Sequence, residues 1–183
     1  MTAMATESAW DVHEAVDFPR GYHVEITDGK IIMRPQGLTQ MKVIFKAARQ
    51  IEDQLAERGD YISDVMVDFP SSLYGYAPDL AVVAPGAELN GRGRYEWHDL
   101  EAVLEVVSKS NQDNDFVKKL GLYAECAIPI YVVIDPSTAL CTLHSSPQSG
   151  RYELSEPVPF GEDLVLPLDG RTITIRTGGF PRD

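Results

Sequence analysis

The sequence predicts an α/β fold in which a mixed β-sheet is flanked by helices and ends in an antiparallel C-terminal extension. Three observations lead to this prediction: an early hairpin pattern, one long amphipathic helix, and a later succession of apolar strand, helix and apolar strand. The chain has 183 residues, of which 44% are hydrophobic and 24% charged. We expect a single domain over residues 1–183, with residues 1–20 as a peripheral N-terminal segment.

The hairpin pattern follows a short helix expected around residues 12–16. Residues 22–26 and 30–34 are rich in β-branched and aromatic side chains, and they flank Asp28 and Gly29. An Asp-Gly pair favours the positive φ angles of a tight turn, so these two segments are predicted to pair as antiparallel strands.

A long helix is predicted over residues 38–58, because its apolar side chains recur at helical spacing. Gly59 follows where a C-cap is expected. Residues 61–69 and 78–84 then have the composition of strands.

The second half of the chain contains a strand, a helix and a second strand in succession, predicted over residues 100–107, 112–126 and 128–134. A helix between two strands indicates parallel pairing with a right-handed crossover. The rest of the chain alternates between turns and short strands, which are expected to extend the sheet in antiparallel fashion. These strands centre on residues 141–144, 151–154, 164–166 and 172–176.

Two acidic residues stand where a charge needs an explanation. Asp79 leads a buried-type apolar run, and Glu105 lies inside the strand predicted over residues 100–107. If the two strands are neighbours, their carboxylates converge and form a site for Mg²⁺ or Mn²⁺. The alternative is that Asp79 caps a turn and Glu105 faces solvent on an edge strand, and spacing does not decide between them.

Basic residues occur on both predicted helices. Asp115, Lys119 and Tyr123 are spaced by four, so Lys119 either reaches back toward the Glu105 strand or forms a surface pair with Asp115. On the long helix, a stripe of basic residues away from the apolar face either contacts phosphates or is simply a solvated face. The stripe comprises Lys42, Lys46 and Arg49, with Arg34, Arg92 and Arg94 as further candidates.

The overall composition excludes several classes of protein. Sixteen Lys and Arg against 28 Asp and Glu give a net charge of −12, which argues against tight nonspecific binding to DNA but does not exclude a nuclease. The spacing of His and Cys does not suggest a zinc site or a disulfide framework, and nucleotide-binding loops and the nucleophile elbow of hydrolases are missing. No apolar stretch spans a bilayer, so we expect a cytoplasmic protein without a membrane partner.

Four ordered segments together resemble the Uma-type family of restriction-endonuclease-like proteins, within the PD-(D/E)XK nuclease superfamily. The segments are Pro78-Asp79, the run from Glu105 to Ser110, the series Asp115, Lys119 and Tyr123, and the run from Ile128 to Pro136. The resemblance covers residues 22–152, including an upstream segment that contains Glu25 and Asp28-Gly29.

The resemblance implies a restriction-endonuclease-like fold and metal-dependent hydrolysis of phosphodiester bonds in nucleic acid, with DNA favoured over RNA. The cation, Mg²⁺ or Mn²⁺, would be held by Asp79, Glu105 and the Val106 carbonyl, with Glu25 completing its shell directly or through water. Lys119 would orient or deprotonate the attacking water, since Val107 occupies the usual lysine position. Lys118 is the neighbour that could substitute for it.

The sequence departs from the family pattern near the start of the long helix, where a histidine is frequent and this chain has Thr39-Gln40-Met41, so either Gln40 or no residue takes its place. Two other interpretations remain open. One is a catalytically inactive nuclease-fold module with a binding or regulatory role, which could be a homodimer. The other is a small-molecule hydrolase that uses the same carboxylates.

Overall fold

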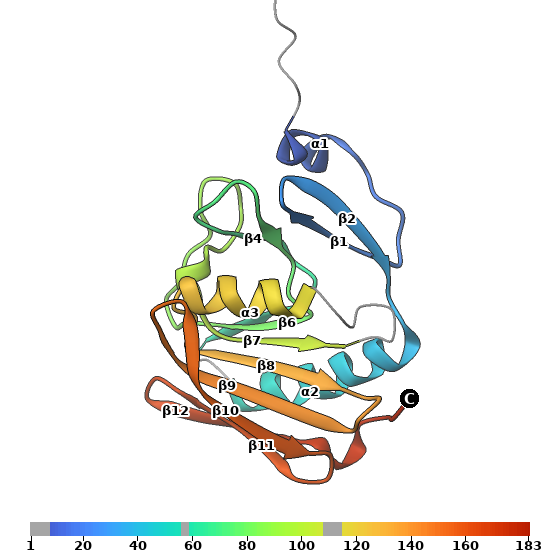
Figure 1. The fold of residues 1–183 in the computed structure, drawn as a ribbon, viewed down its shortest axis with the longest axis vertical. Coiled ribbons are helices and arrows are strands. Elements are labelled where there is room, and N and C mark those ends of the chain that lie inside the picture. Colours follow the sequence, from blue (N-terminus) through green and yellow to red (C-terminus); the bar gives the residue numbers. More distant parts are fainter. Residues whose placement is uncertain (1–7, 56–58, 108–114) are drawn as a thin grey trace, which may run out of the picture.

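A computed structural model of the chain describes residues 8–55, 59–107 and 115–183 (Figure 1). Within these residues, six strands form a central sheet in the order β10-β9-β8-β7-β6-β3. Strands β7 and β8 are parallel, and all the other neighbours are antiparallel. The mixed sheet that the sequence predicts is therefore confirmed. Its strands are β3 (Asp60–Ile62), β6 (Leu80–Val83), β7 (Leu100–Val106), β8 (Ile130–Asp135), β9 (Leu140–Gln148) and β10 (Arg151–Pro159).

A smaller sheet in the order β2-β1-β5-β4 lies beside the central one. Its first two strands are the predicted hairpin, and the turn between them has positive φ angles of 52° at Asp28 and 69° at Gly29. The interpretation of residues 61–69 as one strand is wrong. Asp64, with a φ of 55°, interrupts this segment, so that β3 joins the central sheet and β4 the smaller one. The four strands are β1 (Tyr22–Thr27), β2 (Lys30–Pro35), β4 (Val67–Asp68) and β5 (Gly75–Tyr76).

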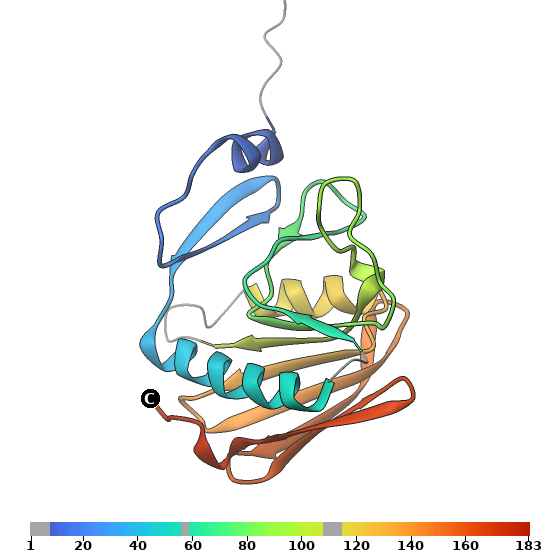
Figure 2. The ribbon, with the colours of Figure 1, turned by 180° about the vertical axis from the view of Figure 1, so that it is seen from behind.

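The two long helices cover opposite faces of the central sheet, as Figures 1 and 2 show. Alternate residues of a strand point to opposite faces. Accordingly, Leu104 of β7 packs in the cluster that contains α2, and Val103 packs in the cluster that contains Tyr123 of α3. None of the helices in the described ranges has the length and apolarity needed to cross a membrane. The helices are α1 (Ala9–Ala15), α2 (Leu38–Leu55) and α3 (Asp115–Glu125).

The predicted positions of these helices agree with the structure to within a few residues. Residues 56–58, at the predicted end of the long helix, and residues 112–114, at the predicted start of the next one, lie outside the described residues. The short helix α1 is attached to the fold by Trp10, whose Nε1 donates a hydrogen bond to the carbonyl of Ser72 at 2.9 Å.

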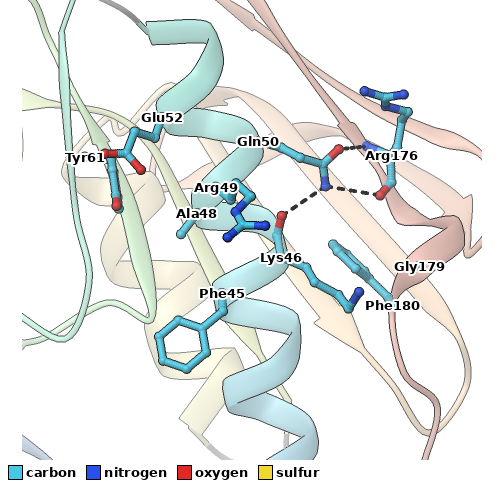
Figure 3. A pocket seen from close by; sticks show the side chains of 10 residues that line it. All are labelled: Phe45, Lys46, Ala48, Arg49, Gln50, Glu52, Tyr61, Arg176, Gly179 and Phe180. Atoms are coloured by element: carbon cyan, nitrogen blue, oxygen red, sulfur yellow. Dashed lines mark hydrogen bonds between the residues drawn. The ribbon is translucent and has the colours of Figure 1, made fainter.

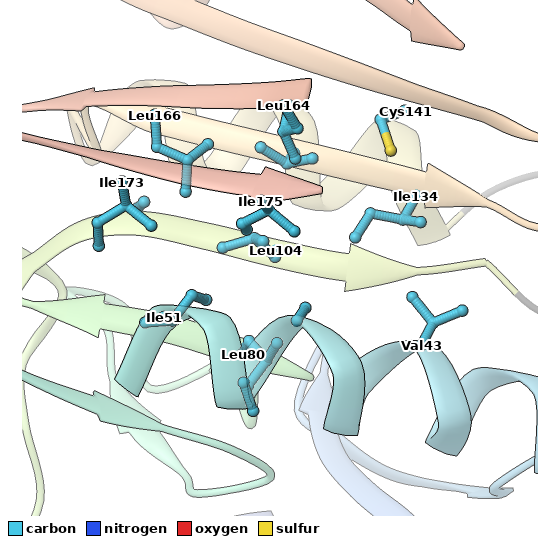
Figure 4. Packing of buried hydrophobic residues seen from close by; sticks show 14 of the residues in the cluster. Val43, Ile51, Leu80, Leu104, Ile134, Cys141, Leu164, Leu166, Ile173 and Ile175 are labelled. Carbon is cyan, nitrogen blue, oxygen red and sulfur yellow. The ribbon is translucent and has the colours of Figure 1, made fainter. Parts of the chain in front are cut away.

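The C-terminal strands divide into two groups. Strands β9 and β10 form the antiparallel extension of the central sheet, whereas β11 (Asp163–Leu168) and β12 (Arg171–Arg176) pair with each other in a separate sheet. Both of these strands turn alternate apolar side chains inward. Figure 4 shows Leu164, Ile173 and Ile175 facing the core that Val43 and Ile51 of α2 also enter. The β11–β12 hairpin thus covers the α2 side of the core.

Two glutamines of α2 satisfy the backbone of β12 in the manner of a neighbouring strand. Gln54 donates from Nε2 to the Thr174 carbonyl at 2.8 Å and accepts at Oε1 from the Thr174 N–H at 2.9 Å. Gln50 makes the same pair of bonds with the backbone of Arg176, at 3.3 and 2.9 Å. These amides fix the helix against the hairpin.

We expect Gln54→Ala to lower the free energy of unfolding by about 1–2 kcal/mol, because two backbone groups of β12 lose their protein partner. Urea unfolding followed by circular dichroism measures the change. Asp53→Ala is the control, since Asp53 is exposed on the same helix and its side chain makes no hydrogen bond within the described part of the chain. Equal unfolding midpoints for the two variants would contradict this role of Gln54.

Candidate active site

Four buried charged residues meet where β1, β6, β7 and α3 approach one another. Glu25 lies on β1, Asp79 directly precedes β6, Glu105 lies on β7 and Lys119 on α3. Their exposed fractions are 0%, 2%, 4% and 3%. Such burial of charge is unusual unless the charges are paired, so the side chains must compensate one another.

The pairing of β6 with β7 explains why the two acids converge. Leu80 lies opposite Leu104, so the next positions outward, Asp79 and Glu105, also face each other and share one side of the sheet. The backbone N–H of Val106 donates to Asp79 Oδ2 at 2.7 Å. The structure therefore brings together the two carboxylates that the sequence singles out, and the alternative of Glu105 as a solvent-facing edge residue is excluded.

Lys119 lies between two carboxylates. Its Nζ is 2.8 Å from Glu25 Oε1 and 2.9 Å from Glu105 Oε1. Tyr123, one turn further along α3, donates its hydroxyl to the same Glu105 Oε1 at 3.1 Å. The i, i+4 spacing of Lys119 and Tyr123 thus places both donors on the helix face that covers the acids. The buried position of Lys119 rules out the alternative of a surface residue.

The start of α2 supplies a further partner for Asp79. Gln40 Nε2 lies 3.1 and 3.2 Å from the two carboxylate oxygens of Asp79, and Gln40 is itself buried. The Ser63 hydroxyl donates to the Asp79 backbone carbonyl at 2.8 Å. Gln40, which stands where the family often has a histidine, is therefore in direct contact with the candidate site.

His23 is a member of this cluster that the sequence reasoning missed. Its Nε2 lies 3.0 Å from Glu25 Oε1, and its Nδ1 lies 2.7 Å from Asp64 Oδ1. On the same hairpin, Arg34 Nη1 approaches Glu25 Oε2 at 3.2 Å. The two-residue period of a strand indicates the His23–Glu25 contact, because these residues are two apart and share one face of β1.

The environment separates the pKa values of the acids. Burial raises the pKa of Glu105 to about 7; the Lys119 charge opposes this rise, and Asp79 and Glu25 add to it. Burial also raises the pKa of Asp79, against the effect of the Val106 N–H bond. For Glu25 burial acts in the same direction, but Lys119 and His23 outweigh it and lower its pKa to about 2. Glu25 is therefore a fixed anion, whereas Glu105 exchanges a proton near neutrality.

The charge of His23 follows from the same contacts. Burial lowers its pKa, but the hydrogen bonds with Asp64 and Glu25, together with the charges of Glu25 and Glu105, outweigh burial and raise it to about 10. His23 is therefore an imidazolium at neutral pH. Glu25 thus has two cationic partners, His23 and Lys119, and a third in Arg34.

The donor set suits a hydrated Mg²⁺ or Mn²⁺, which proteins hold through one or two carboxylates while water and substrate oxygens complete the shell. A carboxylate has about four acceptor positions. Hydrogen bonds take three of those of Asp79, and both bonds to Glu105 end on Oε1. No three His, Cys, Asp or Glu side chains within residues 8–55, 59–107 and 115–183 form a ready-made metal cluster. Asp79 and Glu105 therefore offer oxygen donors of the kind that these cations prefer, and protein donors occupy part of their acceptor positions.

A pocket of about 190 Å³ reaches Asp79 from the surface and is also lined by Gln36, Met41, Phe45 and Asp64. Of the buried acids it reaches Asp79 alone, and it opens on the side of α2 on which Phe45 is exposed. A small reactant can therefore approach Asp79 along the N-terminal half of α2.

The basic residues singled out from the sequence divide into two groups. Lys42, Lys46 and Arg49 are exposed on α2. By contrast, Arg92 and Arg94 pair with Asp68 at 3.1 and 3.3 Å. Arg34 and Lys118 also have carboxylate partners, Glu25 and Asp28 respectively.

We expect Lys119→Met to destabilise the protein by about 3–5 kcal/mol at pH 8, because two buried carboxylates lose the charge between them. The loss should be smaller at pH 5.5, where Glu105, with its pKa near 7, is protonated and one negative charge is removed. Urea unfolding at the two pH values measures both effects. Lys118→Met, a change at an exposed neighbour, is the control. Similar losses for the two variants would contradict the role given to Lys119.

Comparison with known proteins identifies the family and the fold. The sequence matches the Uma2 family, described as putative restriction endonuclease, over residues 10–176. Among solved structures, it is similar to the crystal structure of a putative nuclease belonging to DUF820 from Anabaena variabilis ATCC 29413. The TM-score is 0.70 at 15% sequence identity, and the match covers 92% of this chain and 96% of that one. No curated protein matches.

The identity to the solved structure is low, so this likeness establishes the fold, while the family match rests on the sequence itself. Together they confirm the α/β architecture and the resemblance seen in the ordered motifs. The chain belongs to the Uma2 family of putative restriction endonucleases.

Proposed function

We propose that this protein is a metal-dependent endonuclease that hydrolyses phosphodiester bonds in nucleic acid, and that DNA is its substrate. Family membership supports a nuclease-like function. The observation that carries the proposal is the buried group formed by Asp79, Glu105 and Lys119, in which two carboxylates from neighbouring strands lie beside an amine. In phosphoryl-transfer sites, acids that bind a cation and a neighbouring amine stabilise the negative charge that develops in the transition state.

Asp79 and Glu105 are the residues that hold Mg²⁺ or Mn²⁺ in this proposal, with the Val106 carbonyl as a further ligand. Glu25 completes the shell directly or through water. When bound, the cation lowers the pKa of water and offsets the charge of the scissile phosphate.

Lys119 has the central chemical role among the protein's own groups. Its Nζ, held by Glu25 and Glu105, orients the attacking water and donates to the phosphoryl oxygens as negative charge develops on them. Tyr123 and Gln40 act as positioning residues, since their hydrogen bonds fix the carboxylates of Glu105 and Asp79. His23 likewise holds Glu25 in its anionic form.

The substrate backbone would lie along α2 in this proposal. Lys42, Lys46 and Arg49 are exposed there and supply cations for phosphates on a chain whose net charge is −12. The negative net charge of the protein repels nucleic acid at long range, and the cations of α2 offset this repulsion only near the helix. Because these contacts are electrostatic, binding should weaken steeply as salt is added.

We expect Asp79→Asn to reduce Mn²⁺-dependent nicking of covalently closed circular DNA by more than about 100-fold, since even the residues that support metal ligands typically contribute 10–100-fold. A circular substrate has no ends, so its nicking reports endonuclease action. Asp53→Asn, which removes an exposed acid of α2, is the matched control and should retain activity. If Asp79→Asn stays folded by circular dichroism and still nicks at the wild-type rate, Asp79 has no part in the reaction.

The affinity for Mn²⁺ should rise with pH through about 7. Protonated Glu105, whose pKa is about 7, must lose its proton before it can ligate a cation, so below that pH the affinity falls by up to about tenfold per unit. Calorimetric titrations at pH 6 and pH 8 measure the change, and Glu105→Gln should remove this pH dependence. An affinity that is the same at both pH values would exclude Glu105 as a ligand.

The second candidate is a binding or regulatory module that keeps the fold without turnover. The ion pairs of Lys119 with Glu25 and Glu105 favour it, because they already compensate the buried acids without a cation. Such a module would take up little or no Mn²⁺ at pH 8 and would leave circular DNA intact. The same titration therefore separates the two functions.

A further inference from the structure

A larger pocket, of about 580 Å³, lies between α2 and the C-terminal 3-10 helix η2 (Thr177–Gly179). Figure 3 shows it from close by. The side chains that give it its character are three aromatic residues and three cations, namely Phe45, Tyr61, Phe180, Lys46, Arg49 and Arg176. The buried acids do not line it, so their role leaves this pocket unexplained.

Phe45 joins this pocket to the candidate active site. It lines the 580 Å³ pocket and also the 190 Å³ pocket that reaches Asp79. The two pockets therefore meet at one side chain, and a chain molecule lying over Phe45 would extend from the acids along α2. This continuity is what a polymeric substrate needs.

The exposure of Phe45 has no explanation in the fold. Its exposed fraction is 65%, although the adjacent Ile44 and the nearby Ala48 are buried in the core. In Figure 3 its ring points away from the helix, one turn from Arg49. An exposed aromatic ring beside cations is a platform on which an unpaired nucleobase stacks.

The two cations that α2 contributes to the pocket, Lys46 and Arg49, are available for a ligand. Within the described residues, neither Lys46 nor Arg49 lies within ion-pairing distance of a carboxylate, whereas Arg92, Arg94 and Arg171 all do. The pocket has one acidic lining residue, Glu52, among the part of the chain that the structure describes. The pocket is thus a local cationic strip on an acidic protein.

We propose that this pocket binds single-stranded DNA, with one unpaired base stacked on Phe45 and the adjoining phosphates bound by Lys46 and Arg49. The inference rests on the proposed nuclease function and specifies its substrate as a strand with unpaired bases. A continuous duplex keeps its base faces stacked inside the helix, so it offers phosphates to Lys46 and Arg49 but nothing to the ring of Phe45.

Fluorescence anisotropy with a 5′-labelled oligothymidine of twelve nucleotides tests the stacking. EDTA is present, so the result does not depend on cleavage. We expect the wild type to bind this strand more tightly than a duplex of the same length, and Phe45→Ala to weaken binding by about tenfold. Phe45→Trp, which keeps a stacking surface, should restore it. Leu38→Ala is the control, because Leu38 is equally exposed on α2 but lines neither pocket.

Salt dependence tests the phosphate contacts. Each cation that neutralises a phosphate of a single strand contributes about 0.7 to the slope of log affinity against log salt. Lys46→Ala and Arg49→Ala should each reduce the slope by about this amount, while Phe45→Ala leaves it unchanged. Arg151→Ala removes an exposed charge of β10 and controls for the change in net charge.

The inference is overturned if Phe45→Ala and Leu38→Ala bind alike, or if the duplex binds as tightly as the single strand. An oligouridine and an oligodeoxyuridine of equal length, which differ only in the sugar, are measured in parallel, and tighter binding of the oligouridine would overturn the assignment to DNA. Cleavage of circular single-stranded DNA, which has unpaired bases and no ends, is assayed separately with Mn²⁺. Base stacking on Phe45 without any cleavage of this circle would support the pocket and reject the nuclease, and cleavage that is indifferent to Phe45→Ala would do the reverse.

Discussion

The buried amine of Lys119 holds the candidate site together. It links Glu25 of the small sheet to Glu105 of the central sheet, and so a single charge joins two sheets through a helix that packs on both. Without it, the buried carboxylates of Glu25, Asp79 and Glu105 would lie close together with little access to water. Burial raises the pKa of each acid, and the charges of Lys119, His23 and the other acids then move the pKa values apart.

Most of the architecture could be predicted because it rests on local patterns. The Asp28-Gly29 turn, the apolar period of α2 and the strand, helix and strand around α3 each depend on neighbours in sequence. The division of residues 61–69 between two sheets could not be predicted in this way. It depends on the positive φ of Asp64 and on a hydrogen bond from its N–H to the Pro78 carbonyl, a contact between distant segments.

The site shows the same division between local and distant information. The proximity of Asp79 to Glu105 follows from strand order and could be predicted, and the position of Lys119 follows from helix period. Arg92 and Arg94 form ion pairs with Asp68. This pairing depends on the conformation of a loop, which the amino-acid composition does not specify. His23 was missed for a different reason: its partners are Glu25, two residues away on β1, and Asp64, in the bend after β3, so no helical spacing reveals them.

The glutamine contacts between α2 and β12 have a consequence beyond stability. The side-chain amide of Gln50 bonds to the Lys46 carbonyl at 3.0 Å and to the backbone of Arg176. Gln50 also lines the cationic pocket between α2 and η2. The Gln50 side chain is therefore already ordered before a ligand binds, so binding at this side of the pocket costs little conformational entropy. The same amides occupy the outer hydrogen-bonding edge of β12, which closes this side of the molecule to strand exchange with another copy.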